Sequence, residues 1–77
     1  NPFNPSTIIS FDMPVDGYAS LKVFNSIGQE VGTIVDGHVK AGSYQKVFNA
    51  SQLASGVYFY KFNTEGFSEV RKMSIIK

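Results

Sequence analysis

The sequence predicts an all-β protein, either a sandwich or a barrel, and two patterns carry this prediction. Apolar and polar residues alternate with a period of two over several short segments, as in strands that bury one face. Turn residues separate these segments at intervals of about ten residues. The chain has 77 residues and no cysteine. One domain is therefore expected, stabilised by packed side chains and not by disulfides.

The first three strands are expected over residues 7–13, 18–25 and 30–35. Asp16-Gly17 and Gly28 supply turn chemistry between them, and Asp36-Gly37 is expected to end the third. Gly32 lies inside a strand pattern, which indicates a β-bulge or a close approach of another segment to its backbone. The residues in phase for the core are Thr7, Ile9, Phe11 and Met13; Ala19, Leu21 and Val23; Val31, Thr33 and Val35.

The last three strands are expected over residues 43–49, 56–63 and 67–77. Ala41-Gly42 opens the first of them, and Glu65-Gly66 separates the last two. The intervening NASQLASG is too short for more than one helical turn, so a bend or a short 3₁₀ turn is expected there. The residues in phase for the core are Tyr44 and Phe48; Tyr58, Tyr60 and Phe62; Met73 and Ile75.

A second set of apolar residues falls in the opposite phase, and two explanations of it stay open. Some strands are buried on both faces or kinked by a bulge, or else these residues form an outer patch that docks onto another domain. The set consists of Ile8, Phe24, Ile34, Val47, Val57, Phe59 and Ile76.

Two Asn-Pro pairs stand directly before the first strand. Pro2 and Pro5 fix φ near about −65° and donate no backbone hydrogen bond. Each proline also pushes the residue before it, Asn1 or Asn4, towards an extended conformation. The opening segment is therefore expected to be a stiff, extended lead-in.

Charge and hydropathy exclude several classes of partner. The net charge is +1 and only 17% of residues are charged, with both signs interspersed, so no nucleic-acid-binding stripe is present. No apolar run approaches the roughly 18 residues of a membrane-spanning helix. The chain lacks an initiator Met and a signal-peptide pattern. It is therefore expected to be a piece excised from a longer protein.

No catalytic, metal or cofactor site is expected. His38 is the only histidine and lies in a polar loop, where it lacks the nucleophile and orienting group that catalysis needs. Asp12, Asp16 and Asp36 do not follow a calcium-binding spacing and are better explained as turn residues. Three of the four tyrosines lie in core-like alternation, which favours packing over stacking on sugars.

Four ordered blocks of the sequence resemble one family. They are NPFNPSTIISFDMP, LKVFNSIGQEV, the stretch that runs from VDG through AGSY to FNASQLASGVYFYKF, and RKMSIIK. On these blocks the whole chain resembles the type A C-terminal sorting domain (Por secretion tail) of the type IX secretion system of Bacteroidetes. It is also similar to the immunoglobulin-like domain of flagellar hook-assembly scaffold proteins.

The resemblance implies an immunoglobulin-like β-sandwich of about six to seven antiparallel strands, spanning residues 1–77 as a single C-terminal domain. It implies no enzymatic activity, but a signal that the outer-membrane secretion machinery recognises. The implied partners are that machinery, a surface sortase and an upstream cargo domain in the same parent chain. The implied location is secreted or at the cell surface, reached through the periplasm.

The resemblance also assigns roles to residues by position. Asn4 and Pro5 belong to the family's opening block near the cargo junction, and Gly56, Tyr58 and Tyr60 match its Gly-x-Tyr-x-Tyr strand. The terminal motif maps onto Lys72, Met73 and Lys77, which with Asn4 and Pro5 are the candidates for recognition. The alternative is a carbohydrate-binding or structural immunoglobulin-like accessory module of a secreted hydrolase.

Overall fold

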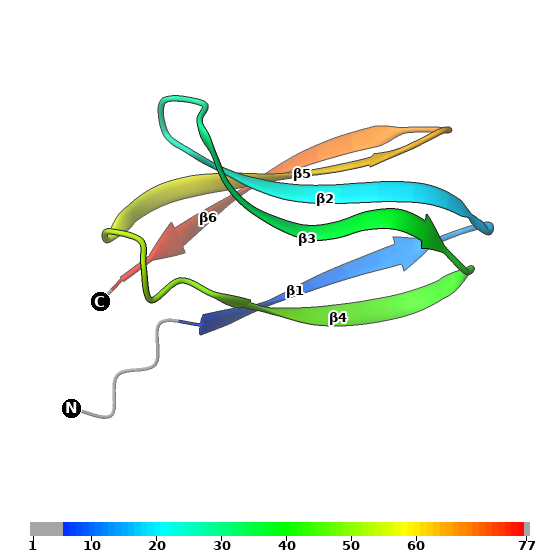
Figure 1. Ribbon diagram of the computed structural model, residues 1–77, viewed down its shortest axis with the longest axis horizontal. Helices are drawn as coiled ribbons and strands as arrows, with labels where there is room; N and C mark the ends of the chain where they lie inside the picture. Colours follow the sequence, from blue (N-terminus) through cyan, green and yellow to red (C-terminus); the bar gives the residue numbers. More distant parts are fainter. Residues whose placement is uncertain (1–5, 77) are drawn as a thin grey trace.

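The computed structural model describes residues 6–76, and over these residues the chain forms strands and turns without a helix. All strand pairs are antiparallel, and they form two sheets: β1 pairs with β4, and the second sheet has the order β3-β2-β5-β6 (Figure 1). The strands are β1 (Ser6–Met13), β2 (Gly17–Asn25), β3 (Glu30–Val39), β4 (Gly42–Asn49), β5 (Gly56–Thr64) and β6 (Ser68–Ile75).

This strand order is that of an immunoglobulin-like sandwich. The four-stranded sheet corresponds to strands C′, C, F and G, and the β1–β4 pair corresponds to strands B and E. Within residues 6–76, the positions of strands A and D beside β1 and β4 are empty. Each sheet therefore ends in two unpaired edges: β1 and β4 in one, β3 and β6 in the other. The predicted β-sandwich is confirmed.

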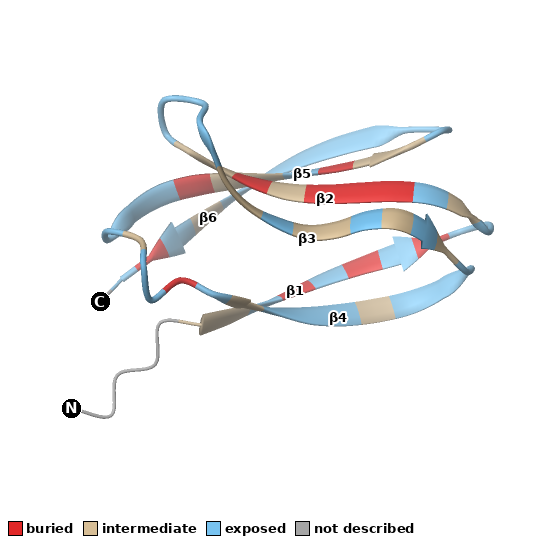
Figure 2. Ribbon diagram, viewed as in Figure 1, coloured by how far each residue is buried: buried red, intermediate tan, exposed pale blue. Residues whose placement is uncertain are grey.

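The core lies between the two sheets and is built from the residues whose alternation predicted it. Leu21 and Val23 on the central strand β2 are both 0% exposed, and Figure 2 shows the buried band along this strand. Burying a side chain of this size stabilises the fold by about 1.5–3 kcal/mol. The other buried core residues are Ile9, Phe11, Met13, Ala19, Ala50, Tyr58, Phe62 and Ile75.

A line of aromatic rings joins the two sheets. Phe11 of β1 stacks on Tyr44 of β4, with ring centroids 5.1 Å apart, and reaches across to Phe62 of β5, also at 5.1 Å. Phe62 in turn meets Phe67 edge-on at 5.6 Å. Offset and edge-on pairs of this kind add about 0.5–1.5 kcal/mol each beyond their area burial. These rings supply much of the cohesion in a domain without cysteine.

Strand β3 departs from the expected phase because it contains two irregularities. The pairing between β2 and β3 shifts between Leu21 and Lys22 and again between Val23 and Phe24. Each shift gives β3 an extra residue and reverses the side to which later residues point. The prediction that Thr33 faces the core is therefore wrong, since Thr33 is exposed while Ile34 packs against the core.

Gly32 lies within this irregular stretch, as the sequence indicated. A Cβ at this position would lie 2.8 Å from Cε1 of Phe48 on β4. Real Cβ atoms do not approach a ring carbon so closely. Glycine at position 32 therefore lets the edge of the Phe48 ring contact the backbone of the opposite sheet.

The prediction that Asp36-Gly37 ends the third strand is wrong. Strand β3 continues to Val39, which pairs with Gly17, and Gly37 pairs with Ala19 in extended conformation. Long strand β2 offers pairing partners over this whole stretch, and cross-strand hydrogen bonds outweigh the weak local turn preference of Asp-Gly.

The segment between β4 and β5 forms a tight turn, as expected. Leu53 donates a backbone hydrogen bond to the carbonyl of Ala50 at 3.0 Å, and the Asn49 side chain accepts one from the Ser51 N–H at 2.9 Å. Ala50 is completely buried. Its burial was not predicted, because alternation does not extend into turns.

The two turns at one end of the sandwich are tied together by Asp16. Its Oδ1 accepts a hydrogen bond of 2.7 Å from the backbone N–H of Ala41, which links the β1–β2 turn to the β3–β4 turn. The contact joins residues 25 positions apart in the chain.

Replacing Asp16 with alanine is expected to destabilise the domain by about 1 kcal/mol, since one hydrogen bond to a surface carboxylate is lost. Chemical denaturation monitored by circular dichroism measures this change. Asp16→Asn keeps an acceptor oxygen and should recover most of the loss. If Asp16→Ala and wild type unfold at the same denaturant concentration, the link between the turns contributes nothing.

The opposite-phase apolar residues divide between the two explanations. Ile34 turns inward through the irregularity in β3, and Phe24 and Phe59 are half-buried. Ile8 and Val47, in contrast, are 62% and 69% exposed and lie directly opposite each other on β1 and β4. Val57 and Ile76 are also exposed. Docking of this exposed set onto another domain stays a prediction.

Candidate recognition surface

Strand β6 is an edge strand and is exposed along most of its length. Among residues 6–76 its one pairing partner is β5, and the residues from Ser68 to Lys72 are all exposed, as the pale strand in Figure 2 shows. Only Met73, half-buried, and Ile75, buried, attach its final third to the core. The backbone groups on its outer side are thus open to an added strand.

The structure brings two of the predicted motifs together. Gly56 is the first residue of β5 and lies opposite Ile75, while Tyr58 lies opposite Met73 and Tyr60 opposite Arg71. The Gly-x-Tyr-x-Tyr motif therefore forms the strand against which the terminal motif pairs.

Tyr58 holds this region to the preceding turn. Its ring is 6% exposed, and its hydroxyl donates a 2.7 Å hydrogen bond to the carbonyl of Ala54. Its neighbour Met73 is half-buried against the core, whereas Lys72 points into solvent. Asn4, Pro5 and Lys77 lie outside the described residues.

A groove of about 410 Å³ runs between β1 and the β5–β6 hairpin. Its walls include the Phe67 ring and an ion pair of 2.8 Å between Arg71 and Glu69. The hydrogen bond and charge of Glu69 raise the pKa of the Arg71 guanidinium above its ordinary value. The two charges of this ion pair satisfy each other, and the other carboxylate that lines the groove is that of Asp12 on β1. The groove occupies the position where strand A of an immunoglobulin sandwich would lie.

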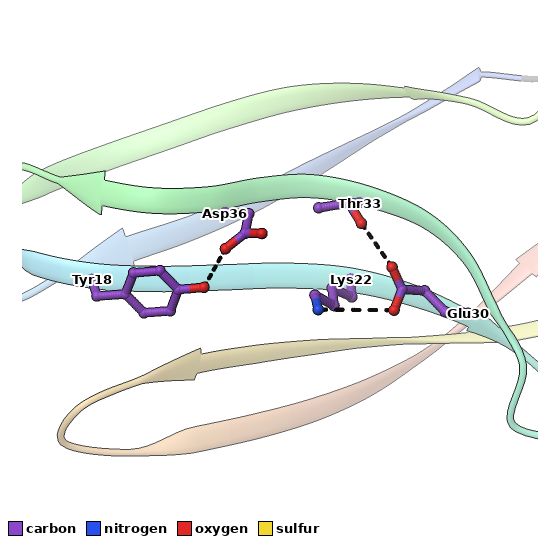
Figure 3. Close-up of polar contacts among 5 residues, drawn as sticks. All are labelled: Tyr18, Lys22, Glu30, Thr33 and Asp36. Atoms are coloured by element: carbon purple, nitrogen blue, oxygen red, sulfur yellow. Dashed lines mark hydrogen bonds and ion pairs between the residues drawn. The ribbon is translucent and has the colours of Figure 1, made fainter.

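The outer face of β2 and β3 carries two polar clusters (Figure 3). The Tyr18 hydroxyl donates a hydrogen bond to Asp36. Glu30 accepts a 2.8 Å hydrogen bond from Thr33 and forms an ion pair with Lys22 at 3.8 Å. The Tyr18–Asp36 and Lys22–Glu30 contacts join β2 to β3, the Thr33–Glu30 contact lies within β3, and the two clusters do not converge on a common point.

The contact with Asp36 perturbs Tyr18. The hydrogen bond, followed by desolvation and the negative charge of the carboxylate, raises the pKa of the Tyr18 phenol above its ordinary value of 10.0. Because the folded-state pKa is the higher one, the contact stabilises the fold fully below pH 10 and is lost as pH rises through the raised value. The pair therefore stays intact at neutral pH.

Within residues 6–76 no group of three or more His, Asp or Glu side chains is arranged to hold a metal ion. None of the elements in that range is a helix with the length and apolarity needed to cross a membrane. His38 is exposed and lies opposite Tyr18 across β2 and β3.

These features define a class of protein: an antiparallel β-sandwich module whose accessible elements are an edge strand and the outer faces of its sheets. The family model for the secretion system C-terminal sorting domain matches residues 1–77. The chain therefore belongs to the type IX secretion C-terminal sorting domain family, which is typical of Bacteroidetes and is a family of sorting signals, not of enzymes. No curated protein and no solved structure matches the chain.

Membership of this family supplies the coarse function. The chain is a C-terminal sorting signal for type IX secretion, and such a tail implies a secreted or cell-surface cargo and a secretion machinery that receives it.

Proposed function

We propose that residues 1–77 are a single sorting domain at the C-terminus of a larger protein, and that β6 is the element the secretion machinery recognises. In this proposal the domain carries its cargo from the periplasm across the outer membrane. A surface sortase then separates the domain from the cargo and attaches the cargo to the cell surface. The exposure of β6 as a sheet edge is the observation that supports this function.

Strand addition is the mode of recognition that such an edge favours. An extended segment of the machinery would pair with the outer side of β6, and main-chain hydrogen bonds would provide the affinity. In this mode the backbone of the tail supplies the affinity, and a few exposed side chains supply the specificity. This mode therefore suits a machine that must accept many cargo proteins carrying similar tails.

In this proposal the residues of the terminal motif have two roles: one anchors β6 to the sheet, and two contact the secretion machinery. Met73 packs beside Tyr58 and fixes β6 on the sheet, so its role in the proposal is to hold the strand in position. Lys72 is exposed on the outer face and is assigned to contact with the machinery. Lys77, the last residue of the motif, is assigned to the same contact.

Asn4 and Pro5 are assigned to the junction with the cargo. Proline removes a backbone donor and favours an extended chain. A segment with these properties resists pairing with a neighbouring strand and presents an extended substrate to a protease such as the sortase.

The double change Lys72→Ser/Lys77→Ser tests this proposal in the full-length cargo protein. Both changes remove charge, and Lys72 is exposed, so the domain is expected to fold while export and surface attachment fall strongly. Export is measured as the fraction of cargo on intact cells, and folding as the thermal unfolding midpoint of the isolated chain.

The matched control is Lys40→Ser/Lys46→Ser, which removes the same charge at exposed positions away from β6. This control should be exported normally. Wild-type export and attachment of the Lys72→Ser/Lys77→Ser protein would refute the assigned recognition residues.

A further inference from the structure

The outer face of β5 and β6 carries cations that the rest of the described chain leaves unpaired. Lys61 and Lys72 are exposed, and neither forms an ion pair with another of residues 6–76, where the pairs are Lys22–Glu30 and Arg71–Glu69. Both point away from the core, because their neighbours Phe62 and Met73 point into it. The two ammonium groups thus share one solvent-facing surface.

The register of the sheet places these cations around one aromatic side chain. Phe59 lies directly opposite Lys72 on β6 and two residues before Lys61 on β5. On its other side Phe59 lies opposite Phe24 of β2. Phe24 and Phe59 lie on the outer face and are half-buried, so part of each ring is exposed to solvent. We call the surface formed by Phe24, Phe59, Lys61 and Lys72 the basic-aromatic face.

A third lysine adds to the excess of positive charge on this face. Lys22 of β2 lies directly opposite Lys61, and like charges in this position repel each other. Glu30 pairs with Lys22 at 3.8 Å and offsets part of that repulsion (Figure 3). No acidic group within the described residues pairs with Lys61 or Lys72. A partner carboxylate would therefore relieve repulsion as well as form a new contact.

We propose that the basic-aromatic face binds an extended acidic segment of another protein, in which two glutamates stand at alternate positions. This inference deepens the proposed function and rests on it, because it names the chemistry of the surface that the secretion machinery presents to the domain.

Spacing supports an extended segment with this pattern. Lys61 lies opposite Val70, so Lys72 is its diagonal neighbour on β6, and such neighbours are about 7–8 Å apart. In an extended chain, residues i and i+2 point to the same side and lie about 6.6–6.8 Å apart. A Glu-x-Glu segment can therefore place one carboxylate near each ammonium group, and the methylene groups of the two Glu side chains can cover Phe59, which lies directly opposite Lys72 and two residues before Lys61.

The small number of cations favours a peptide over other anionic partners. Double-stranded DNA carries one charge per about 1.7 Å and is bound by many cations together. Two unpaired lysines flanking exposed apolar surface match a few discrete carboxylates better than a polyanion. An anionic lipid surface also requires a larger basic cluster, of about four to eight Lys or Arg.

Fluorescence anisotropy with a labelled peptide tests the proposal. In the probe, two Glu residues occupy alternate positions and Ser fills the other positions; the comparison probe carries Gln in place of both Glu residues. The wild-type chain is expected to bind the acidic probe at least about tenfold more tightly than the Gln probe. This preference should disappear at about 1 M salt, because the Debye length falls to about 3 Å there and the charges are screened from one another.

The variant Lys61→Glu/Lys72→Glu should weaken binding of the acidic probe by at least about tenfold. Its matched control, Lys40→Glu/Lys46→Glu, makes the same charge change at exposed positions outside this face and should bind as wild type. Lys61→Glu also places a carboxylate opposite Lys22, so the fold should be retained; thermal unfolding verifies this for each variant.

Three results would overturn the inference: equal affinity for the two probes, equal loss in both double variants, or tight binding to phosphatidylglycerol vesicles without binding to the acidic probe. The last result would assign the face to an anionic lipid.

Export of cargo carrying Lys61→Glu separates this inference from the proposed function. Normal export of this variant, with export lost in Lys72→Ser/Lys77→Ser, would leave the sorting function standing and remove only the acidic contact.

Discussion

Replacing Tyr58 with alanine is expected to destabilise the domain by roughly 3–5 kcal/mol and to abolish export. The ring is 6% exposed in the core, and its loss leaves a cavity at the point where β5 supports Met73 of β6. Whole domains are stable by only about 5–15 kcal/mol, with small ones near the lower limit. The variant is therefore expected to keep only about 0–2 kcal/mol of stability, and its thermal unfolding midpoint should fall sharply.

The matched variant Tyr58→Phe separates packing from hydrogen bonding. It keeps the ring and removes only the 2.7 Å hydrogen bond to the Ala54 carbonyl, so a loss of about 0.5–1.5 kcal/mol is expected. Export of this variant should survive. A Tyr58→Ala protein as stable as wild type would contradict the packing described for β5 and β6.

Gly32→Val is expected to destabilise the domain by about 1–3 kcal/mol through overcrowding. The new Cβ would lie 2.8 Å from Cε1 and 3.3 Å from Cζ of Phe48, so the ring or strand β3 has to move. Valine favours β-strands, and on strand preference alone the change would be stabilising. The sign of the measured change in unfolding free energy therefore distinguishes the steric effect from strand preference.

A double-mutant cycle with Phe48→Leu locates the clash. Leucine lacks the Cε1 and Cζ atoms, so Gly32→Val should cost close to nothing in the Phe48→Leu background. The double variant is therefore expected to be less destabilised than the sum of the two single variants, by at least about 0.5 kcal/mol. Additive effects of the two substitutions would show that the Phe48 ring does not restrict position 32.

Because the sheet of β1 and β4 is small, strand edges of the domain stay available for association with another protein. Over the part of the chain that the structure describes, two strands cover the four-stranded sheet, which leaves the groove beside β1 and an exposed β6. Unpaired edges promote association, and many proteins protect them with charge. In β6 the exposed residues include Glu69, Arg71 and Lys72. These charges keep the edge soluble while its backbone stays available for pairing.

The sequence by itself determined the strands and most of the core, because both follow from local alternation. Ile9, Phe11 and Leu21 are buried as their phase predicted, and the four ordered sequence blocks were sufficient to identify the family. Turn residues likewise located the breaks at Gly28 and Glu65-Gly66. These features depend on residues close together in the chain.

Tertiary structure alone decided the register and the neighbours across strands. The inward turn of Ile34, the extension of β3 through Gly37 and the contact of Phe48 with Gly32 all arise from pairing with segments distant in sequence. The placement of Lys61 diagonal to Lys72 has the same origin. The period of a strand tells which side a residue faces, but the strand beside it is chosen by burial summed over the whole sandwich.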